Sequence, residues 1–297
     1  MANKRPIIVI DRETGEAFEE AILGEGWLRW AYHDKRSGLL RRALFSTPFF
    51  SRLMGRWYDS RLSRRKIAKV IRDLGIDVSE FADPADSYRS FNDFFTRQLK
   101  PEVRPYSKDP KEVVAPADGR TLVFPTITED TFAPVKGRPF SIRKMLPSHA
   151  ETFINGALAV IRLSPADYHR YHFPCAGEII EHKDIKGLFH SVNPIALERA
   201  SDVFGDNKRA YTIIDTKVAG RICYMEIGAF GVGSIVNTCC SGSVEKMQEK
   251  GYFKFGGSTV VLLFEEGKIE FCEDLVKNSA EGKETLVKVG QPLARVL

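Results

Sequence analysis

The chain has 297 residues, of which 43% are hydrophobic and 28% are charged, enough to bury one large core or two modest ones. This composition excludes an extended low-complexity chain and favours an ordinary globular protein. The net charge of +5 is uneven, because residues 1–72 hold 16 Lys and Arg against 8 Asp and Glu. We therefore expect a strong basic field near one end of the protein.

The start of the chain and its cysteines predict a protein that stays in a reducing compartment, on the cytoplasmic side. The apolar run at residues 6–10 is too short for the core of a secretory signal. The longest uncharged stretch, residues 227–244, is rich in Gly and Ser, which is typical of strands and turns and not of a spanning helix. The cysteines form no CxxC pair and predict buried reduced thiols, at positions 175, 223, 239, 240 and 272.

The N-terminal third is predicted to be helical, basic and aromatic. Residues 29–72 contain 13 basic residues, interleaved with Trp, Tyr, Phe and Leu. Ser63 is a candidate N-cap, and Gly75 a stop signal, for a helix with apolar residues at i, i+3, i+4 and i+7. Such a segment suits the headgroup region of an anionic bilayer, and it equally suits a helical layer packed on the rest of the protein.

A basic face with aromatic residues also raises nucleic acid as a partner. The sequence has no zinc-finger spacing, no RNP-like aromatic strand and no recognisable recognition helix. Nucleic acid is therefore not expected as a partner.

From residue 113 onward, short apolar runs separated by Gly, Pro, Asn and Asp predict a mainly β structure. The turn at residues 265–268 is predicted to join the run 259–264 to residues 269–271 as a hairpin. We expect an α+β fold, with a helical membrane-association region at residues 1–90. It would lie on a β-rich, sandwich-like or barrel-like catalytic domain at residues 91–297.

Three segments carry residues suited to chemistry. Residues 115–119 break a strand at a turn and present Asp118, residues 164–174 hold His169 and His172, and a Gly-Gly pair precedes Ser258. Each has a plainer interpretation, namely an Asx-turn, structural histidines and a glycine bulge at a strand entrance. No segment decides the function by itself.

Taken together and in this order, the segments strongly resemble the phosphatidylserine decarboxylase family. The matching stretches are residues 91–95, 103–105, 115–119, 163–174, 191–194, 251–259 and 289–293. Gly256 departs from the Leu that often precedes Gly-Ser-Thr in the family, which concerns the subtype and not the activity. Residues 1–90 match less clearly, so the membrane role expected there rests on composition.

The resemblance implies a zymogen that cuts itself between Gly257 and Ser258. The Ser258 hydroxyl would attack the Gly257 carbonyl, the peptide would become an ester, and β-elimination would split the chain. His172 is carried over as the base, and Asp118 as the carboxylate that orients and charges it. The products would be two associated chains, 1–257 and 258–297, the second starting with a pyruvoyl cofactor made from Ser258.

For turnover, the resemblance implies a Schiff base between the pyruvoyl group and the amine of phosphatidylserine, with phosphatidylethanolamine as product. His169 is assigned to assist decarboxylation or to protonate the α-carbon. No metal is needed, and a homodimer is implied. The N-terminal region would attach the enzyme peripherally to the cytoplasmic face of an anionic membrane, which is the cell membrane if the source is bacterial.

Two alternatives stay open. A non-catalytic anionic-lipid-binding protein of the same fold would leave the chain intact at Ser258. A pyruvoyl decarboxylase of a soluble amino acid would share the chemistry but would have little use for a basic, aromatic N-terminal region.

Overall fold

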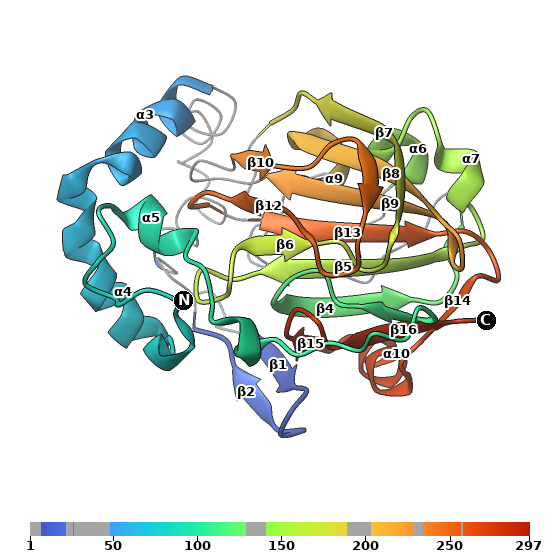
Figure 1. Cartoon of the computed structure of the whole chain (residues 1–297), viewed down its shortest axis with the longest axis horizontal. Helices are drawn as coiled ribbons and strands as arrows, with labels where there is room; N and C mark the ends of the chain where they lie inside the picture. The colour runs from blue at the N-terminus through green and yellow to red at the C-terminus, as the bar shows by residue number, and fades with distance from the viewer. Residues whose placement is uncertain are drawn as a thin grey trace.

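The computed structural model describes residues 7–21, 26, 48–128, 141–188, 203–228, 234–256 and 258–297. Within them, a helical layer lies beside a larger β-rich body (Figure 1), which confirms the α+β class. The predicted segments at residues 27–47 and 191–194, and Gly257, lie outside the described residues. In the described part of the chain, no helix combines the length and the apolar character that crossing a bilayer requires.

The body is built on a ten-stranded sheet in the order β11-β7-β8-β9-β13-β5-β4-β15-β1-β2. Every neighbouring pair is antiparallel except β1 and β15. The sheet is open at β11 and β2 and is not a closed barrel. Its strands are β1 (Ile8–Asp11), β2 (Ala17–Glu19), β4 (Gly119–Phe124), β5 (Ala157–Leu163), β7 (Gly177–Ile185), β8 (Arg209–Thr216), β9 (Gly220–Gly228), β11 (Gly242–Val244), β13 (Ser258–Phe264) and β15 (Glu284–Val287).

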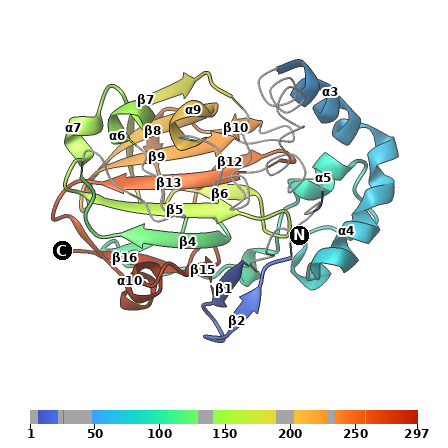
Figure 2. The same cartoon turned by 180° about the vertical axis from the view of Figure 1, so that it is seen from behind.

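Both faces of the central strands are buried, because side chains on β13 alternate between two cores. Val260 and Leu262 join the core shared with two small sheets, and Val261 and Leu263 join the opposite core. The small sheets are β10-β12-β6 and β14-β16-β3, and the short helices α6, α7 and α9 cover the other face (Figure 2). A further helix, α10, packs into the core that contains the small sheets. The bounds of these strands and helices are β3 (Glu112–Val114), β6 (Arg170–His172), β10 (Ile235–Asn237), β12 (Glu249–Phe253), β14 (Ile269–Phe271), β16 (Pro292–Val296), α6 (Ile142–Met145), α7 (Ala150–Phe153), α9 (Val203–Asp206) and α10 (Glu273–Ala280).

The helical layer has its own aromatic core. It comprises α3 (Pro48–Asp59), α4 (Ile67–Leu74), α5 (Phe91–Phe95) and the 3-10 turns η2 (Arg61–Lys66), η3 (Val78–Glu80) and η4 (Pro101–Val103). Tyr58, Phe91, Phe94 and Phe95 pack together in this core, so α5 belongs to the layer as much as α3 does.

The helix predicted around Ile67 exists, but its start is not capped by Ser63. The Ser63 hydroxyl donates to the carbonyls of Tyr58 and Ser60 and accepts from the Phe91 N–H, within a 3-10 turn that precedes α4. Gly75 ends α4 with a φ of +63°, a conformation that glycine adopts without strain, so the stop signal is confirmed.

Three further expectations were wrong. The thiols are not all buried, because Cys240 is exposed and Cys239 and Cys272 are only partly buried. Residues 8–11 and 17–19 are strands of the large sheet, so the N-terminal third is not helical throughout. The turn at residues 265–268 does not close a hairpin, because β13 pairs with β5 and β9 whereas β14 pairs with β16 in another sheet. The division of the chain near residue 90 stays a prediction.

Candidate active site

Four adjacent strands start or end along one edge of the large sheet, here called the site edge. These ends are Gly119 of β4, Leu163 of β5, Ser258 of β13 and Gly228 of β9. Ser258 pairs with Leu163 on one side and with Gly228 on the other. The sheet thus brings the predicted segments to one edge, with Asp118 before β4, His169 and His172 after β5, and Ser258 opening β13.

Ser258 is completely buried at the start of the central strand β13. The alternation along β13 places its side chain on the same face as Val260 and Leu262, toward the sheet that contains β6 and β12. Its hydroxyl has no hydrogen-bond partner among the described residues. A buried polar group without a partner is uncommon in folded proteins and calls for a functional explanation.

His169 is fully buried against the aromatic core of the helical layer. Its ring lies 3.8 Å from the ring of Phe95, measured between centroids. Nδ1 lies 2.9 Å from the Asp167 carbonyl oxygen, so Nδ1 carries the proton and Nε2, which has no partner in the described residues, carries a lone pair. Burial, and then the nearby Arg97, lower the pKa of His169 to about 3.

His172 lies on β6 in a different environment. Its backbone N–H donates to the Pro116 carbonyl oxygen over 2.8 Å, which ties β6 to the segment that carries Asp118. Its ring stacks near Tyr168, and Nδ1 is buried with no partner in the part of the chain that the structure describes. Burial, and then Arg170, lower the pKa of His172 to about 4, so the ring is neutral at pH 7.

Asp118 is held by groups other than His172. Arg104 donates to both carboxylate oxygens, over 3.2 and 2.7 Å, and the Val289 N–H donates to one of them over 2.7 Å. Among the described residues, neither oxygen of Asp118 is hydrogen-bonded to His172. The structure thus brings the two predicted partners to the same edge without the contact that their predicted roles require.

A network of buried charges surrounds the site edge, and the sequence interpretation missed it. Arg120 pairs with Asp167 and with Glu20, and Arg162 pairs with Glu20 and with Glu284. Arg120 and Arg162 stand inside apolar runs that were predicted to be strands. That pattern could have indicated buried ion pairs, because arginine is almost never buried unless it is paired. These pairs fix the strands on which the site is built.

Arg97 was also missed, although it lies two residues after the matching stretch at residues 91–95. It is 4% exposed, and its guanidinium lies over the rings of Phe81 and Phe94. One nitrogen donates to the carbonyls of Ala166 and Asp167, while Nε and Nη1 have no partner among the described residues. A buried cation therefore lies beside His169 and keeps that ring neutral.

The comparisons with known proteins point to one family. The family model for phosphatidylserine decarboxylase matches residues 91–295, which include every part of the site edge. The phosphatidylserine decarboxylase proenzyme of Chlamydia trachomatis serovar L2 is 40% identical over 294 residues, or 98% of each chain. Proenzymes with the same name match from Clostridium botulinum strain 657 (40% over 277 residues, 92% of this chain and 94% of the relative) and from Fusobacterium nucleatum (38% over 292 residues, 97% of each).

Proposed function

Because the chain belongs to the phosphatidylserine decarboxylase family, we propose that it converts phosphatidylserine to phosphatidylethanolamine and carbon dioxide after cutting itself between Gly257 and Ser258. The relatives are named proenzymes, which fits a chain that must be processed before it works. The observation that carries the proposal is the buried hydroxyl of Ser258 at the site edge, which lies inside the matched family region and has no hydrogen-bond partner among the described residues.

Self-cutting uses groups of this chain and one water molecule. Ser258 Oγ adds to the Gly257 carbonyl carbon, the peptide C–N bond breaks, and an ester with a free amine results. Removal of the Ser258 α-proton then breaks the bond between Ser258 Cβ and Oγ, so Oγ leaves as part of the Gly257 carboxylate and Ser258 becomes a dehydroalanine. Water converts the dehydroalanine to a pyruvoyl end and releases ammonia. His172 is neutral at pH 7 and its Nδ1 has no partner within the described ranges, so it suits the role of base.

Asp118 is proposed to support His172 from the neighbouring segment. The shared hydrogen bond between His172 N and Pro116 O keeps that segment beside β6. Asp118 Oδ2 accepts only from Arg104 among the described residues, which leaves it acceptor capacity for the His172 ring.

The residues present fit a prosthetic group made in place, because Ser258 is buried and its hydroxyl has no partner among the described residues. Two histidines that are neutral at pH 7 lie on the segment that follows β5 at the same edge. The pyruvoyl group supplies an electron-withdrawing ketone for loss of the carboxylate. His169 is proposed to assist that loss or to return a proton to the α-carbon. Its Nε2 lone pair has no partner in the described part of the chain, and negative charge developing nearby would raise the pKa of the ring.

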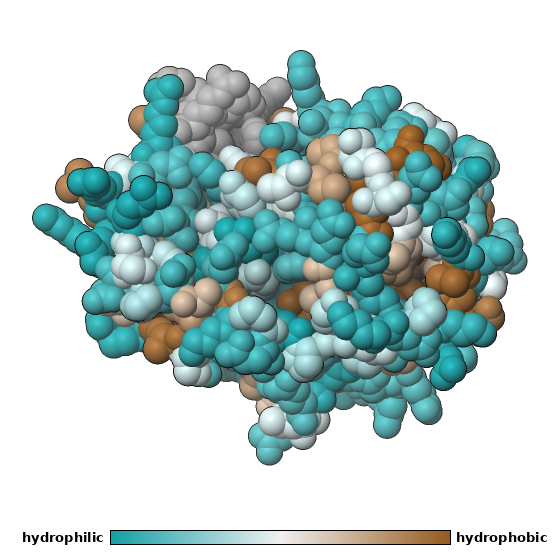
Figure 3. Space-filling model, in the orientation of Figure 1, coloured by the Kyte–Doolittle hydropathy of each residue, from teal (hydrophilic) through white to brown (hydrophobic). Residues whose placement is uncertain are grey.

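Membrane attachment is proposed through the described part of the helical layer. Leu53, Trp57 and Leu62 are exposed there, the last at 65%. Exposed arginines lie between and after them, at positions 56, 61, 64 and 65, and the helical side of the surface mixes hydrophobic and hydrophilic residues (Figure 3). Each basic residue near an anionic surface contributes about 1 kcal/mol, so peripheral binding is expected.

Intact-mass spectrometry of the purified protein beside Ser258→Ala tests the proposal. Wild type should give two chains divided after Gly257, with a pyruvoyl-blocked small chain, and Ser258→Ala should give one mass. Vesicles containing phosphatidylserine should then yield phosphatidylethanolamine with wild type only. A single uncut wild-type mass would instead favour a lipid-binding protein, and decarboxylation of free serine but not of the lipid would favour a soluble amino acid as substrate.

A further inference from the structure

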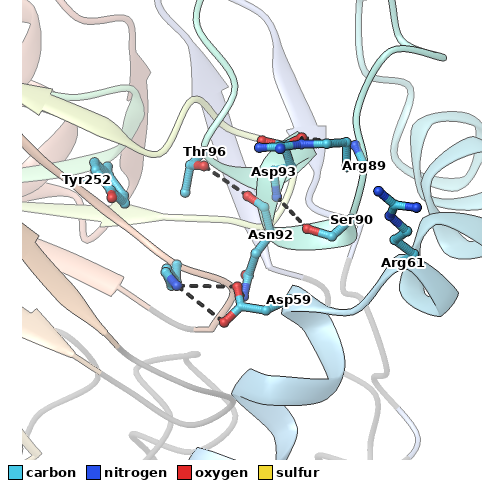
Figure 4. A pocket seen from close by; sticks show the side chains of 9 residues that line it. Asp59, Arg61, Arg89, Ser90, Asn92, Asp93, Thr96 and Tyr252 are labelled. Carbon is cyan, nitrogen blue, oxygen red and sulfur yellow. Dashed lines mark hydrogen bonds and ion pairs between the residues drawn. The ribbon is translucent and has the colours of Figure 1, made fainter.

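The chain between β12 and β13 leads directly to the proposed cut, and the helical layer holds its first half. β12 ends at Phe253 and β13 begins at Ser258, so residues 254–257 form the whole connection. Lys254 lines an open hollow of about 420 Å³ together with residues of α3 and α5 (Figure 4). The two sides of this hollow are thus the helical layer and the segment that precedes the cut.

Asn92 of α5 bridges the two sides with both ends of its amide. Oδ1 accepts from the Phe255 backbone N–H over 2.9 Å, and Nδ2 donates to Asp59 Oδ1, also over 2.9 Å. The two partners fix the orientation of the Asn92 amide. If the amide were flipped, its NH2 group would face the Phe255 N–H and its oxygen would face the Asp59 carboxylate, and neither pair can form a hydrogen bond. Asn92 is 3% exposed, so water does not readily replace these bonds.

Asp59, at the end of α3, completes the arrangement. Its carboxylate accepts from Asn92 and also lies 3.2 Å from Lys254 Nζ. The layer therefore contacts two consecutive residues before the Gly-Gly pair, one through the backbone and one through the side chain.

The Phe255 side chain adds an apolar anchor to the same layer. Its ring centroid lies 4.3 Å from that of Tyr58, 5.0 Å from Phe91 and 5.2 Å from Phe95. Phe95 also stacks on His169, so one aromatic cluster contacts both the segment before the cut and a site histidine.

We propose that Asn92, backed by Asp59, is a positioning residue for self-cleavage, a role that rests on the proposed cut at Gly257. Two glycines next to the cut give the backbone wide freedom, and Gly256 has a φ of +151°, which other residues rarely adopt. Downstream, Ser258 is fixed by its pairing in β13. Anchoring Phe255 upstream therefore favours conformations in which the Gly257 carbonyl lies close to Ser258 Oγ.

The test follows self-cleavage in time. Wild type, Asn92→Ala and Ser258→Ala are made by cell-free synthesis, synthesis is stopped, and the precursor and the two chains are quantified by gel and intact mass. Asn92→Ala should cut at the same bond but on the order of tenfold more slowly, or worse, because the attack geometry is populated less often. The matched control is Asp93→Asn, on the same helix and lining the same hollow, which should cut at the wild-type rate.

A swap separates positioning from general damage to the fold. Asn92→Asp alone keeps an acceptor for the Phe255 N–H but faces the carboxylate of Asp59. Adding Asp59→Asn restores a donor opposite that acceptor, so the double variant should cut faster than Asn92→Asp alone. Asp59→Ala alone, at a half-exposed position, gives a milder variant that should show intermediate slowing even where Asn92→Ala does not fold.

The outcomes distinguish this inference from the function on which it rests. Wild-type cleavage that Ser258→Ala abolishes sustains the proposed function whatever Asn92 does. Asn92→Ala or Asp59→Ala cutting at the wild-type rate, or a swap without recovery, overturns the positioning role alone. An uncut wild type overturns both.

Discussion

His169 and His172 are three residues apart, yet the chain gives their rings different neighbours. His169 packs against Phe95 near the charge of Arg97, and the Asp167 carbonyl sets its tautomer. His172 stands near Tyr168, and its buried Nδ1 has no partner among the residues that the structure describes. His172→Ala should leave the precursor uncut, and His169→Ala should still cut but decarboxylate poorly. Gel analysis and a lipid assay measure the two steps separately. Equal loss of cutting in both variants would contradict this division of roles.

The buried histidines also predict an acid-sensitive fold. The unfolded rings bind protons below about pH 6.5, while the folded pKa of His169 is about 3, so the unfolded state binds more protons in between. Stability contributed by this ring is complete above pH 6.5 and is lost as the pH falls, at about 1.4 kcal/mol per pH unit. Urea titrations of Ser258→Ala between pH 4 and 7 should show this slope. Adding His169→Gln should reduce it, and an unchanged slope would refute the cause.

Glu20 links two buried arginines, so its loss should destabilise the fold. Arg120 and Arg162 stand directly opposite one another on β4 and β5, and Glu20 pairs with both, each over 2.8 Å. Burial raises the pKa of Glu20, but the two arginines outweigh it and hold the pKa below its usual value. Glu20→Gln removes the negative charge shared by the two guanidiniums, although Asp167 still pairs with Arg120 and Glu284 with Arg162. The change should lower the unfolding free energy by about 1.5–3 kcal/mol, measured in urea.

A matched control lies at the surface. Glu281 pairs with Lys283, and both side chains are 46% exposed. Glu281→Gln should leave the unfolding free energy unchanged within error. A similar loss in both variants would show that burial of the network is not the cause.

Much of the site could be predicted from motifs, but its contacts could not. Asp118 lies just before β4 and Ser258 is the first residue of β13, and both strands begin at the same edge of the sheet. The bond from Arg104 to Asp118 was not predictable, because it depends on how residues 103–105 pass the edge and not on local pattern. Arg97 lay beside a recognised stretch, and only its burial in the fold identifies it.

At the scale of elements, α3 and η2 carry the proposed membrane contact. Changing Leu53, Trp57 and Leu62 together to Ser removes exposed apolar surface and should weaken sedimentation with phosphatidylserine vesicles. Added salt should weaken wild-type binding as well, because the arginines act through screened charge. Ile180→Ser, at an equally exposed site on β7, is the control. Undiminished sedimentation of the triple variant would place the contact elsewhere.

The elements show where sequence patterns succeed and fail. The apolar runs at 121–124, 158–163 and 259–264 all became strands, because a run buried on both faces has few alternatives. The hairpin after β13 failed because β14 finds its partner in β16, a choice made by the tertiary fold. β1 was missed because its parallel partner, β15, lies at the other end of the chain.

At the scale of the whole molecule, the small chain expected from the cut is interwoven with the large one. Residues 258–297 supply β13 between β9 and β5, β15 between β4 and β1, and β16 beside β3. Ser258→Ala should refold from urea at a rate independent of protein concentration, while the cut protein should refold in a concentration-dependent way and with low yield. Circular dichroism recovery at several concentrations measures this. Equal, concentration-independent recovery would contradict the two-chain interpretation.

The position of β13 between two strands of the large chain has a consequence for the life of the enzyme. Only the uncut chain contains in one molecule all the strands that form the large sheet, and the proposed cut divides these strands between two chains. A serine converted to a prosthetic group cannot be regenerated by unfolding and trying again. Each molecule would then be processed only once, and a molecule that unfolds after processing would have to be replaced by new synthesis.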